Sequence, residues 1–330
     1  MKVPLNLKLF CLAFFSFAIV LLCLWLGPAC IFPSNDSQAL RPDLASELFW
    51  KIRFPRVMLA FVVGAGLALG GACFQTTFGN PLATPYTLGV ASGASLGAVL
   101  ALRFVGFGAG NQASVSISSM IGALSTVALV LFIARRCKAM ESSSMLLAGV
   151  AISLFFSSLI LFIQYISDFT QSFVSLRWLM GSLDTVGYSS LAYTTPVVLI
   201  SSAVIFSLRH ELDVIATGND LALSRGVEVS SVKTAIFIFV SLIVGSVVSV
   251  AGPIGFVGII VPHLARAFVG SLHSAIFPSA ILLGGTLLVF CDTLGRVIVA
   301  PAEIPVGVIM ALVGGPCFLF VLVYRVSRQE

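Results

Sequence analysis

The chain has 330 residues, of which 58% are hydrophobic and 9% are charged, with a formal net charge of +5. Soluble globular proteins carry about 25% charged residues, and disordered chains are poor in apolar residues, so the composition excludes both classes. The mean hydropathy of +1.10 and the 29 glycines instead indicate a polytopic helical membrane protein, because small residues allow helices in lipid to approach closely.

Apolar runs long enough to cross a membrane recur along the whole chain. The first run follows Lys2 and Lys8, and no cleavage site typical of a signal peptide follows it, so we interpret it as a retained span. At about 20 residues per span, we expect an all-α bundle forming one transmembrane domain over residues 1–330. Its ten predicted spans are 9–26, 57–76, 86–106, 115–134, 145–166, 190–207, 234–251, 254–270, 275–294 and 305–324.

The lysines and arginines orient these spans. With a cytoplasmic N-terminus, eleven of the eighteen lie inside and seven outside, in agreement with the usual excess of positive charge in cytoplasmic loops. Ten spans then place the C-terminus inside as well. Segments 28–56 and 167–189 are expected outside, and 208–233 is the one sizeable cytoplasmic segment. Four of the seven outer positive charges lie within residues 41–56. Such a cluster runs against the usual scarcity of positive charge outside, which indicates that these residues have a function.

The cytoplasmic segment 208–233 contains signals for a short helix. Asn219 and Asp220 are suited to cap the start of such a helix, and Gly226 is suited to end it. A short amphipathic helix on the cytoplasmic face would be a docking element for a soluble partner. A solvated loop without a partner is the alternative.

No motif in the chain supplies energy for transport. There is no Gly-Lys pair, and therefore no phosphate-binding GxxxxGK[ST] loop. The thirteen acidic residues fall in loops or near span ends, with Asp292 the deepest, whereas ion-coupled carriers usually keep carboxylates inside the membrane. By elimination we expect a transporter driven by a separate cytoplasmic protein. The alternatives are a stand-alone secondary carrier or channel, and a membrane-embedded scaffold or sensor.

The sequence also contains no recognisable catalytic or metal-binding motif. HExxH, paired aspartates and a nucleophile with an adjacent base are all missing. The three histidines are scattered, and the seven cysteines form no CxxC pair. We therefore expect no enzyme activity and no metal bound by this chain.

Six segments carry a resemblance to a known family. They are RFPRVMLAFVVGAGLALGGACFQTTFGNPLATPYTLGVASGA (53–94), LLAGVAIS (146–153), WLMGSLD (178–184), GPIGFVGIIVPHLAR (252–266), DTLGR (292–296) and EIPVGVIMALVGGPCF (303–318). Together they resemble the permeases of iron-chelate, haem and cobalamin ABC importers, the FecCD-type or type II importer family. The resemblance covers the chain from about residue 50 to its end.

The resemblance implies a machine as well as a fold. It implies ten transmembrane helices with both ends in the cytoplasm of a prokaryote, in a multi-pass protein of the cytoplasmic (inner) membrane. In membrane lipid, the permease would pair with a second copy or a paralogue. Two ATP-binding subunits would dock on its cytoplasmic side and a substrate-binding protein on its outer side. ATP and Mg²⁺ would act through the partner ATPase, with no cofactor on this chain and no nucleic acid partner. The binding protein would largely choose the cargo.

The resemblance further implies that Arg53, Arg56 and Arg296 face outward and meet acidic residues of the binding protein. Exposed ion pairs contribute only about 0.2–1 kcal/mol each, but they steer encounter and orientation. The alternative for each arginine is snorkelling to the membrane interface.

Two short cytoplasmic turns are implied to form the inner gate. One contains Asn80 and Leu82, with Pro81 interrupting the helix, and the other contains Ser142 and Ser143. The alternative is a tight turn without a gating role.

The resemblance implies that the loop 216–227 couples the permease to its ATPase. The loop would fit a cleft on the ATPase and relay the closure of that partner. The residues concerned are Gly218, Asp220, Ala222, Arg225 and Gly226. Arg225 departs from the pattern of the family, in which many members carry Leu before the glycine.

Overall fold

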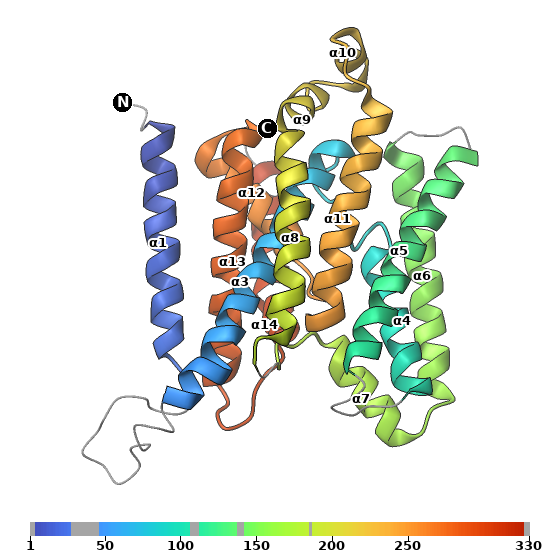
Figure 1. Cartoon of the computed structure of the whole chain (residues 1–330). Helices are drawn as coiled ribbons and strands as arrows, with labels where there is room; N and C mark the ends of the chain where they lie inside the picture. Colours follow the sequence, from blue (N-terminus) through green and yellow to red (C-terminus); the bar gives the residue numbers. More distant parts are fainter. Residues whose placement is uncertain (1–3, 28–45, 106–111, 137–141, 185–186, 327–330) are drawn as a thin grey trace.

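The computed structural model describes residues 4–27, 46–105, 112–136, 142–184 and 187–326. Within these ranges every regular element is a helix (Figure 1). The helices are α1 (Leu5–Trp25), η1 (Phe49–Arg53), α3 (Phe54–Thr77), α4 (Val90–Phe104), α5 (Gln112–Arg136), α6 (Ser142–Tyr165), α7 (Phe169–Leu179), α8 (Ser189–Ser207), α9 (Arg209–Ile215), α10 (Asn219–Ser224), α11 (Val229–Ala251), α12 (Val257–Val269), α13 (His273–Val297) and α14 (Val306–Val326).

The predicted all-helical membrane class is confirmed. A helix lies at each of the ten predicted ranges, and within the described residues seven helices are long and apolar enough to cross a membrane. The apolar parts of α4, α12 and α14 are shorter. Ten membrane-crossing helices therefore stay a prediction. Most of the external segment 28–56, namely residues 28–45, lies outside the described residues.

Two of the shorter helices begin later than predicted because the backbone before them is not helical. Before α4, Thr84 and Thr87 form a closed turn in which the backbone N–H of Thr84 donates to Thr87 Oγ1 at 3.0 Å, and Gly89 has a φ of 82°. Before α12, Phe256 has a φ of 66°. Residues in this left-handed region end or delay a right-handed helix. The predicted starts at 86 and 254 are therefore early.

Helix α3 lies at the centre of the bundle, packed against α11, α12 and α13. Glycines permit the closest approaches: a Cβ added at Gly64 would overlap the carbonyl of Gly284 on α13, and one added at Gly71 would overlap the carbonyl of Gly258 on α12. Contact between backbones increases van der Waals packing, which is the main force between helices in lipid. The glycine-rich motif therefore determines how closely α3 approaches its neighbours.

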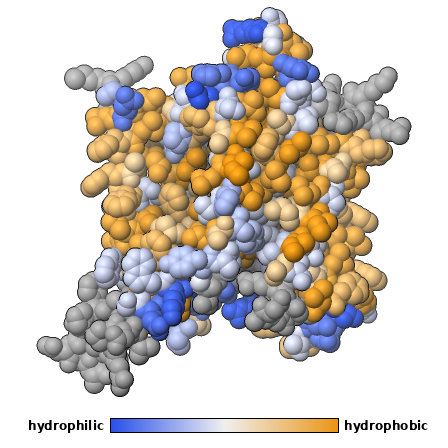
Figure 2. All heavy atoms as spheres, in the orientation of Figure 1, coloured by the Kyte–Doolittle hydropathy of each residue, from blue (hydrophilic) through white to orange (hydrophobic). Residues whose placement is uncertain are grey.

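The bundle has two polar ends, separated by a band of hydrophobic residues (Figure 2). One end carries α9, α10 and both ends of the chain, and we name it the α10 face; the other carries η1 and α7, and we name it the α7 face (Figure 1). The predicted cytoplasmic segment 208–233 contains α9 and α10 on the first face, and the predicted outer segment 167–189 contains α7 on the second. The two segments thus lie at opposite ends.

Candidate functional site

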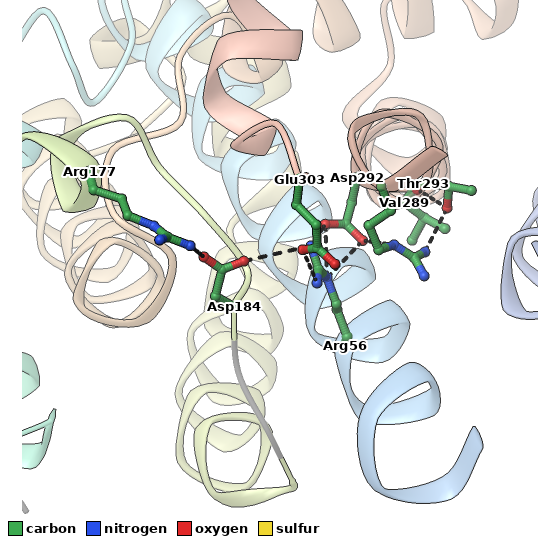
Figure 3. A network of polar contacts seen from close by, with 8 residues as sticks. Arg56, Arg177, Asp184, Val289, Asp292, Thr293 and Glu303 are labelled. Atoms are coloured by element: carbon green, nitrogen blue, oxygen red, sulfur yellow. Dashed lines mark hydrogen bonds and ion pairs between the residues drawn. The ribbon is translucent and has the colours of Figure 1, made fainter. Parts of the chain in front are cut away.

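A group of charged residues lies at the α7 face, and we name it the α7-face cluster: Arg56, Asp184, Asp292, Arg296 and Glu303. Figure 3 shows Arg56 beside the three carboxylates. The two arginines and Asp292 are buried, whereas Asp184 and Glu303 are exposed. Arg56 is its centre. Its Nη2 and Nε donate to Asp292 Oδ1 at 2.9 and 3.1 Å, and its Nη1 donates to Glu303 Oε2 at 2.8 Å. These contacts join the start of α3 to the end of α13 and to the connection before α14.

Asp292 is shared by two guanidinium groups. Arg296 follows it by one helical turn on α13, and its Nε lies 3.1 Å from Asp292 Oδ2, while its Nη2 donates to Thr293 Oγ1 at 3.0 Å. The Asp292 side chain is 2% exposed and that of Arg296 is 4% exposed. Buried charges are tolerated when they are paired and hydrogen-bonded. Arg56 and Asp292 meet both conditions, whereas Arg296 Nε is paired with Asp292 but makes no hydrogen bond within the described residues.

The cluster reaches the surface through Asp184. Asp184 Oδ1 lies 3.8 Å from Arg56 Nη2, and its Oδ2 accepts a hydrogen bond from Arg177 Nη2 at 3.2 Å. The Arg177 side chain is 64% exposed and that of Asp184 is 38% exposed. A continuous path of ionic contacts therefore runs from the buried end of α13 to the surface beside α7.

The exposure expected for the three arginines is wrong. Arg53, Arg56 and Arg296 are 3%, 8% and 3% exposed. Arg53 Nη1 donates to the carbonyl of Trp25 at 3.2 Å, and the other two pair with Asp292. These partners could not be predicted from the sequence, because Arg56 and Asp292 are 236 residues apart. The one available signal was the spacing of four between Asp292 and Arg296, which places them on the same side of a helix.

At the opposite face, α10 has the bounds that its sequence predicts. It runs from Asn219 to Ser224, and Gly226 follows with a φ of 79°. The N–H groups of Gly226 and Val227 donate to the carbonyls of Leu223 and Ala222, both at 3.0 Å, which is the Schellman arrangement. The expected Asx cap is wrong, because Gly218 occupies the N-cap position and no side chain caps the helix.

The side chains of α10 divide into a buried and an exposed set. Ala222 is fully buried, whereas Leu221 and Leu223 on either side of it are 53% and 59% exposed. Asp220 and Arg225 are exposed as well. The two leucines were not among the predicted coupling residues, although two apolar residues in a polar loop are a visible signal in the sequence. They give α10 an apolar surface directed away from the bundle.

The predicted gate residues lie in two separate segments. Asn80 and Leu82 form a turn after α3, in which Asn80 Oδ1 accepts a hydrogen bond from the N–H of Leu82 at 2.9 Å; Leu82 is 46% exposed. Ser142 begins α6 as predicted, but the side chains of Ser142 and Ser143 lie outside the described residues. Within the described residues no group of three or more His, Cys, Asp or Glu side chains is placed to hold a metal ion.

Known proteins resemble this chain both in sequence and in fold. Residues 11–324 match the model of the FecCD transport family. The molybdate import system permease MolB of Haemophilus influenzae is 34% identical, over 88% of this chain and 86% of its own. The hemin transport system permease HmuU of Yersinia pestis is 36% identical, over 87% and 86%. A solved inward-facing metal-chelate type ABC transporter is 31% identical, with a TM-score of 0.86 over 96% and 98% of the two chains.

Proposed function

Because this chain belongs to the FecCD transport family, we propose that it forms the membrane pathway of an ATP-driven importer for a metal-chelate nutrient such as an iron-siderophore, haem or cobalamin. The observation that carries the proposal is the likeness to the metal-chelate type transporter along 96% of the chain. The related permeases named for molybdate and for hemin indicate that this architecture serves different cargoes, so the choice among them belongs to the binding protein.

We propose that all ten apolar helices cross the cytoplasmic membrane of a prokaryote as one domain over residues 1–330. The α10 face is then cytoplasmic, and the chain begins and ends there. The eleven lysines and arginines on that side, against seven on the other, support this orientation. Helices α4 and α12, with 15 and 13 residues, extend about 1.5 Å per residue and cross together with the irregular segments before them, which are covered by other helices.

Two copies of the permease, or one copy and a paralogue, would enclose the pathway in membrane lipid, with two ATP-binding subunits on the α10 face. The permease binds no cofactor and no nucleic acid in this proposal, and ATP and Mg²⁺ act in the partner ATPase. Exposed Leu221 and Leu223 on α10 support an apolar contact with that partner. Gly218 and Gly226 have open space around them and allow the sharp turns that project α10. Ala222, being buried, seats α10 on the bundle, while Asp220 and Arg225 border its contact surface.

The turn containing Asn80 and Leu82 and the start of α6 at Ser142 and Ser143 would form the inner gate with their symmetry mates. The exposed Leu82 side chain supports a contact across the pair of permeases. Closing a pathway with so short a turn would require small displacements only, and Pro81 inside the turn prevents it from continuing the helix.

A substrate-binding protein would dock on the α7 face. Arg53, Arg56 and Arg296 are buried, so in this proposal they hold the docking surface from beneath and the exposed charges beside them meet the partner. Arg177 and Asp184 are the exposed members next to the cluster. Exposed charges of this kind orient a partner and still allow it to leave.

The α10 contact predicts a specific loss of ATPase binding. Replacing both Leu221 and Leu223 with serine should weaken binding of the ATPase by about 30-fold or more, the effect of losing a hot spot of about 2 kcal/mol. Co-purification and binding titrations with the ATPase would measure this. Ser224→Ala, on the same exposed helix, is the matched control and should bind normally. Normal binding by the double variant would contradict the role of α10.

Uptake into proteoliposomes tests the function itself. With the ATPase and the binding protein present, haem, ferric citrate or cobalamin should accumulate only when ATP is supplied. Proteoliposomes that contain the permease alone, under a proton or sodium gradient, are the control and should accumulate none of them. Concentrative uptake in that control would contradict the proposal and support the alternative of a stand-alone secondary carrier.

A further inference from the structure

A chain of polar contacts joins three helices at the α10 face. Asp213 Oδ1, on α9, lies 2.6 Å from His273 Nδ1 and accepts the backbone N–H of His273 at 2.9 Å. On the other side of the ring, His273 Nε2 lies 2.8 Å from Thr76 Oγ1 near the end of α3. His273 is 2% exposed. The ring therefore bridges α9 and α3 inside the protein.

The direction of each hydrogen bond follows from the chemistry of the groups. An ionised carboxylate only accepts, so Nδ1 of His273 carries the proton that faces Asp213. In the neutral ring Nε2 is then an acceptor. A hydrogen bond from Thr76 to Nε2 uses the one proton of its hydroxyl, for which the carbonyl of Ala72 at 3.2 Å is the competing acceptor. Asp213 also satisfies the free N–H at the first residue of α13, where a helix has unpaired donors and where no local side chain caps it. One carboxylate thus both caps α13 and orients the imidazole.

The first end of this chain is tied to α10. Leu212 and Ile215, which flank Asp213 on α9, are buried in the core, so α9 is firmly seated. Only residues 216–218 separate α9 from α10, and their N–H groups donate to carbonyls of α9 at 2.9 to 3.1 Å. The connection from α10 to α9, and so to Asp213, is therefore hydrogen-bonded at each of its three residues.

The other end is tied to the turn that contains Asn80 and Leu82. The carbonyls of Thr76 and Gln75 accept the N–H groups of Gly79 and Asn80, each at 3.1 Å. This turn is built on the residue that His273 contacts and on the residue before it. The backbone of Thr76 therefore supports the turn, while its side chain contacts His273.

A second polar contact fixes the same end of α3 from another side. Gln75 Nε2 donates to the carbonyls of Gly258 and Ile259 on α12 at 3.1 and 3.3 Å, and Arg266 Nη1 donates to Gln75 Oε1. These contacts run to α12 and do not include α9. Of these two sets of contacts, the set through Asp213 leads to α9 and α10.

From these contacts we infer that Asp213, His273 and Thr76 form a relay that transmits the position of α9 and α10 to the gate turn. The inference rests on the proposed function, because it presumes an ATPase at α10 and a gate at Leu82. The three are positioning residues: they contact neither nucleotide nor cargo. They couple two sites, α10 and the gate turn. Such coupling typically changes the equilibrium constant at one site by a factor of about five or more when the other site is occupied.

The test measures gate position in the assembled importer, with Leu82→Cys in both permeases and the yield of disulfide crosslinking across the pair as the readout. The parent chain without this cysteine gives the background. ATP should change the yield of the crosslink. Asp213→Asn or Thr76→Val should reduce this ATP-dependent change by roughly fivefold or more. The variant that carries both changes should lose no more of the ATP response than either single variant, because the two changes break the same path. Thr76→Ser keeps the hydroxyl and should retain the response.

Controls separate the relay from simple damage to the fold. Glu228→Gln removes an exposed carboxylate from the same segment and should respond like the parent. Thermal midpoints and crosslinking without nucleotide should be similar in Thr76→Val and in the chain with Thr76, because valine has nearly the shape of threonine and lacks only its hydroxyl. A normal ATP response in Asp213→Asn and Thr76→Val would overturn the relay alone. If the chain that carries Leu82→Cys alone shows no ATP response, both the gate role of the Leu82 turn and the relay are overturned.

Discussion

Replacement of Asp292 by asparagine is expected to destabilise the permease by about 3–5 kcal/mol, the usual effect of breaking a buried ion pair. The variant keeps the shape of the side chain and removes its charge. Arg56 then retains Glu303 and the more distant Asp184 as partners, while Arg296 loses its ion pair. The measurement is the midpoint of thermal unfolding of the purified permease in detergent, together with the yield of folded protein.

Two further variants identify the cause of the expected loss. Glu47→Gln removes a carboxylate from the exposed pair with Lys51 and should leave the midpoint unchanged, because such pairs are screened by water. Adding Arg296→Gln to Asp292→Asn should cost less than the sum of the single changes, since it removes one of the two unpaired cations. An unchanged midpoint in Asp292→Asn would contradict the stabilising role of the cluster.

The second large effect is expected at Gly71, where α3 meets α12. Gly71→Val should destabilise the bundle by about 3 kcal/mol, the upper part of the range usual for overpacking. The added Cβ would overlap the carbonyl and Cα of Gly258, which are backbone atoms and cannot turn aside as a side chain can. The two helices would have to separate, and the hydrogen bonds from Gln75 to α12 would lengthen.

The matched control is Gly315→Ala on α14, where an added Cβ meets nothing within 4 Å. It should unfold at the same temperature as the parent or slightly above, because alanine favours helix over glycine. Thermal unfolding in detergent and protease resistance of the permease would measure both changes. A Gly71→Val protein as stable as the control would show that α3 and α12 do not need their close contact.

The sequence alone predicted much of the fold because the signals concerned are local. Hydropathy located a helix at each of ten ranges, and the pair Asn219 and Asp220 with Gly226 located α10. Hydropathy acts over about 20 residues, and the signals that start or end a helix act within one turn. Both kinds of signal are present in the chain whatever its neighbours in space.

Prediction failed where a role depended on contacts. The three arginines of the docking hypothesis were expected at the surface, but their burial depends on partners such as Asp292 that lie far away in the chain. The late starts of α4 and α12 depend on left-handed residues, and Phe256 is of a type that rarely adopts that conformation. Apart from the spacing of four between Asp292 and Arg296, no local pattern indicated either result.

Composition, hydropathy and the six motifs by themselves determined that this protein is a helical membrane permease, where its helices lie along the chain, and where α10 begins and ends. Only the tertiary structure decided that Arg56 meets Asp292, that Gly71 meets Gly258, and that Asp213 reaches Thr76 through His273. The physical reason is the range of the interactions. Membrane insertion and helix capping act on neighbours in sequence, whereas ion pairs, close packing and hydrogen-bonded bridges act on neighbours in space.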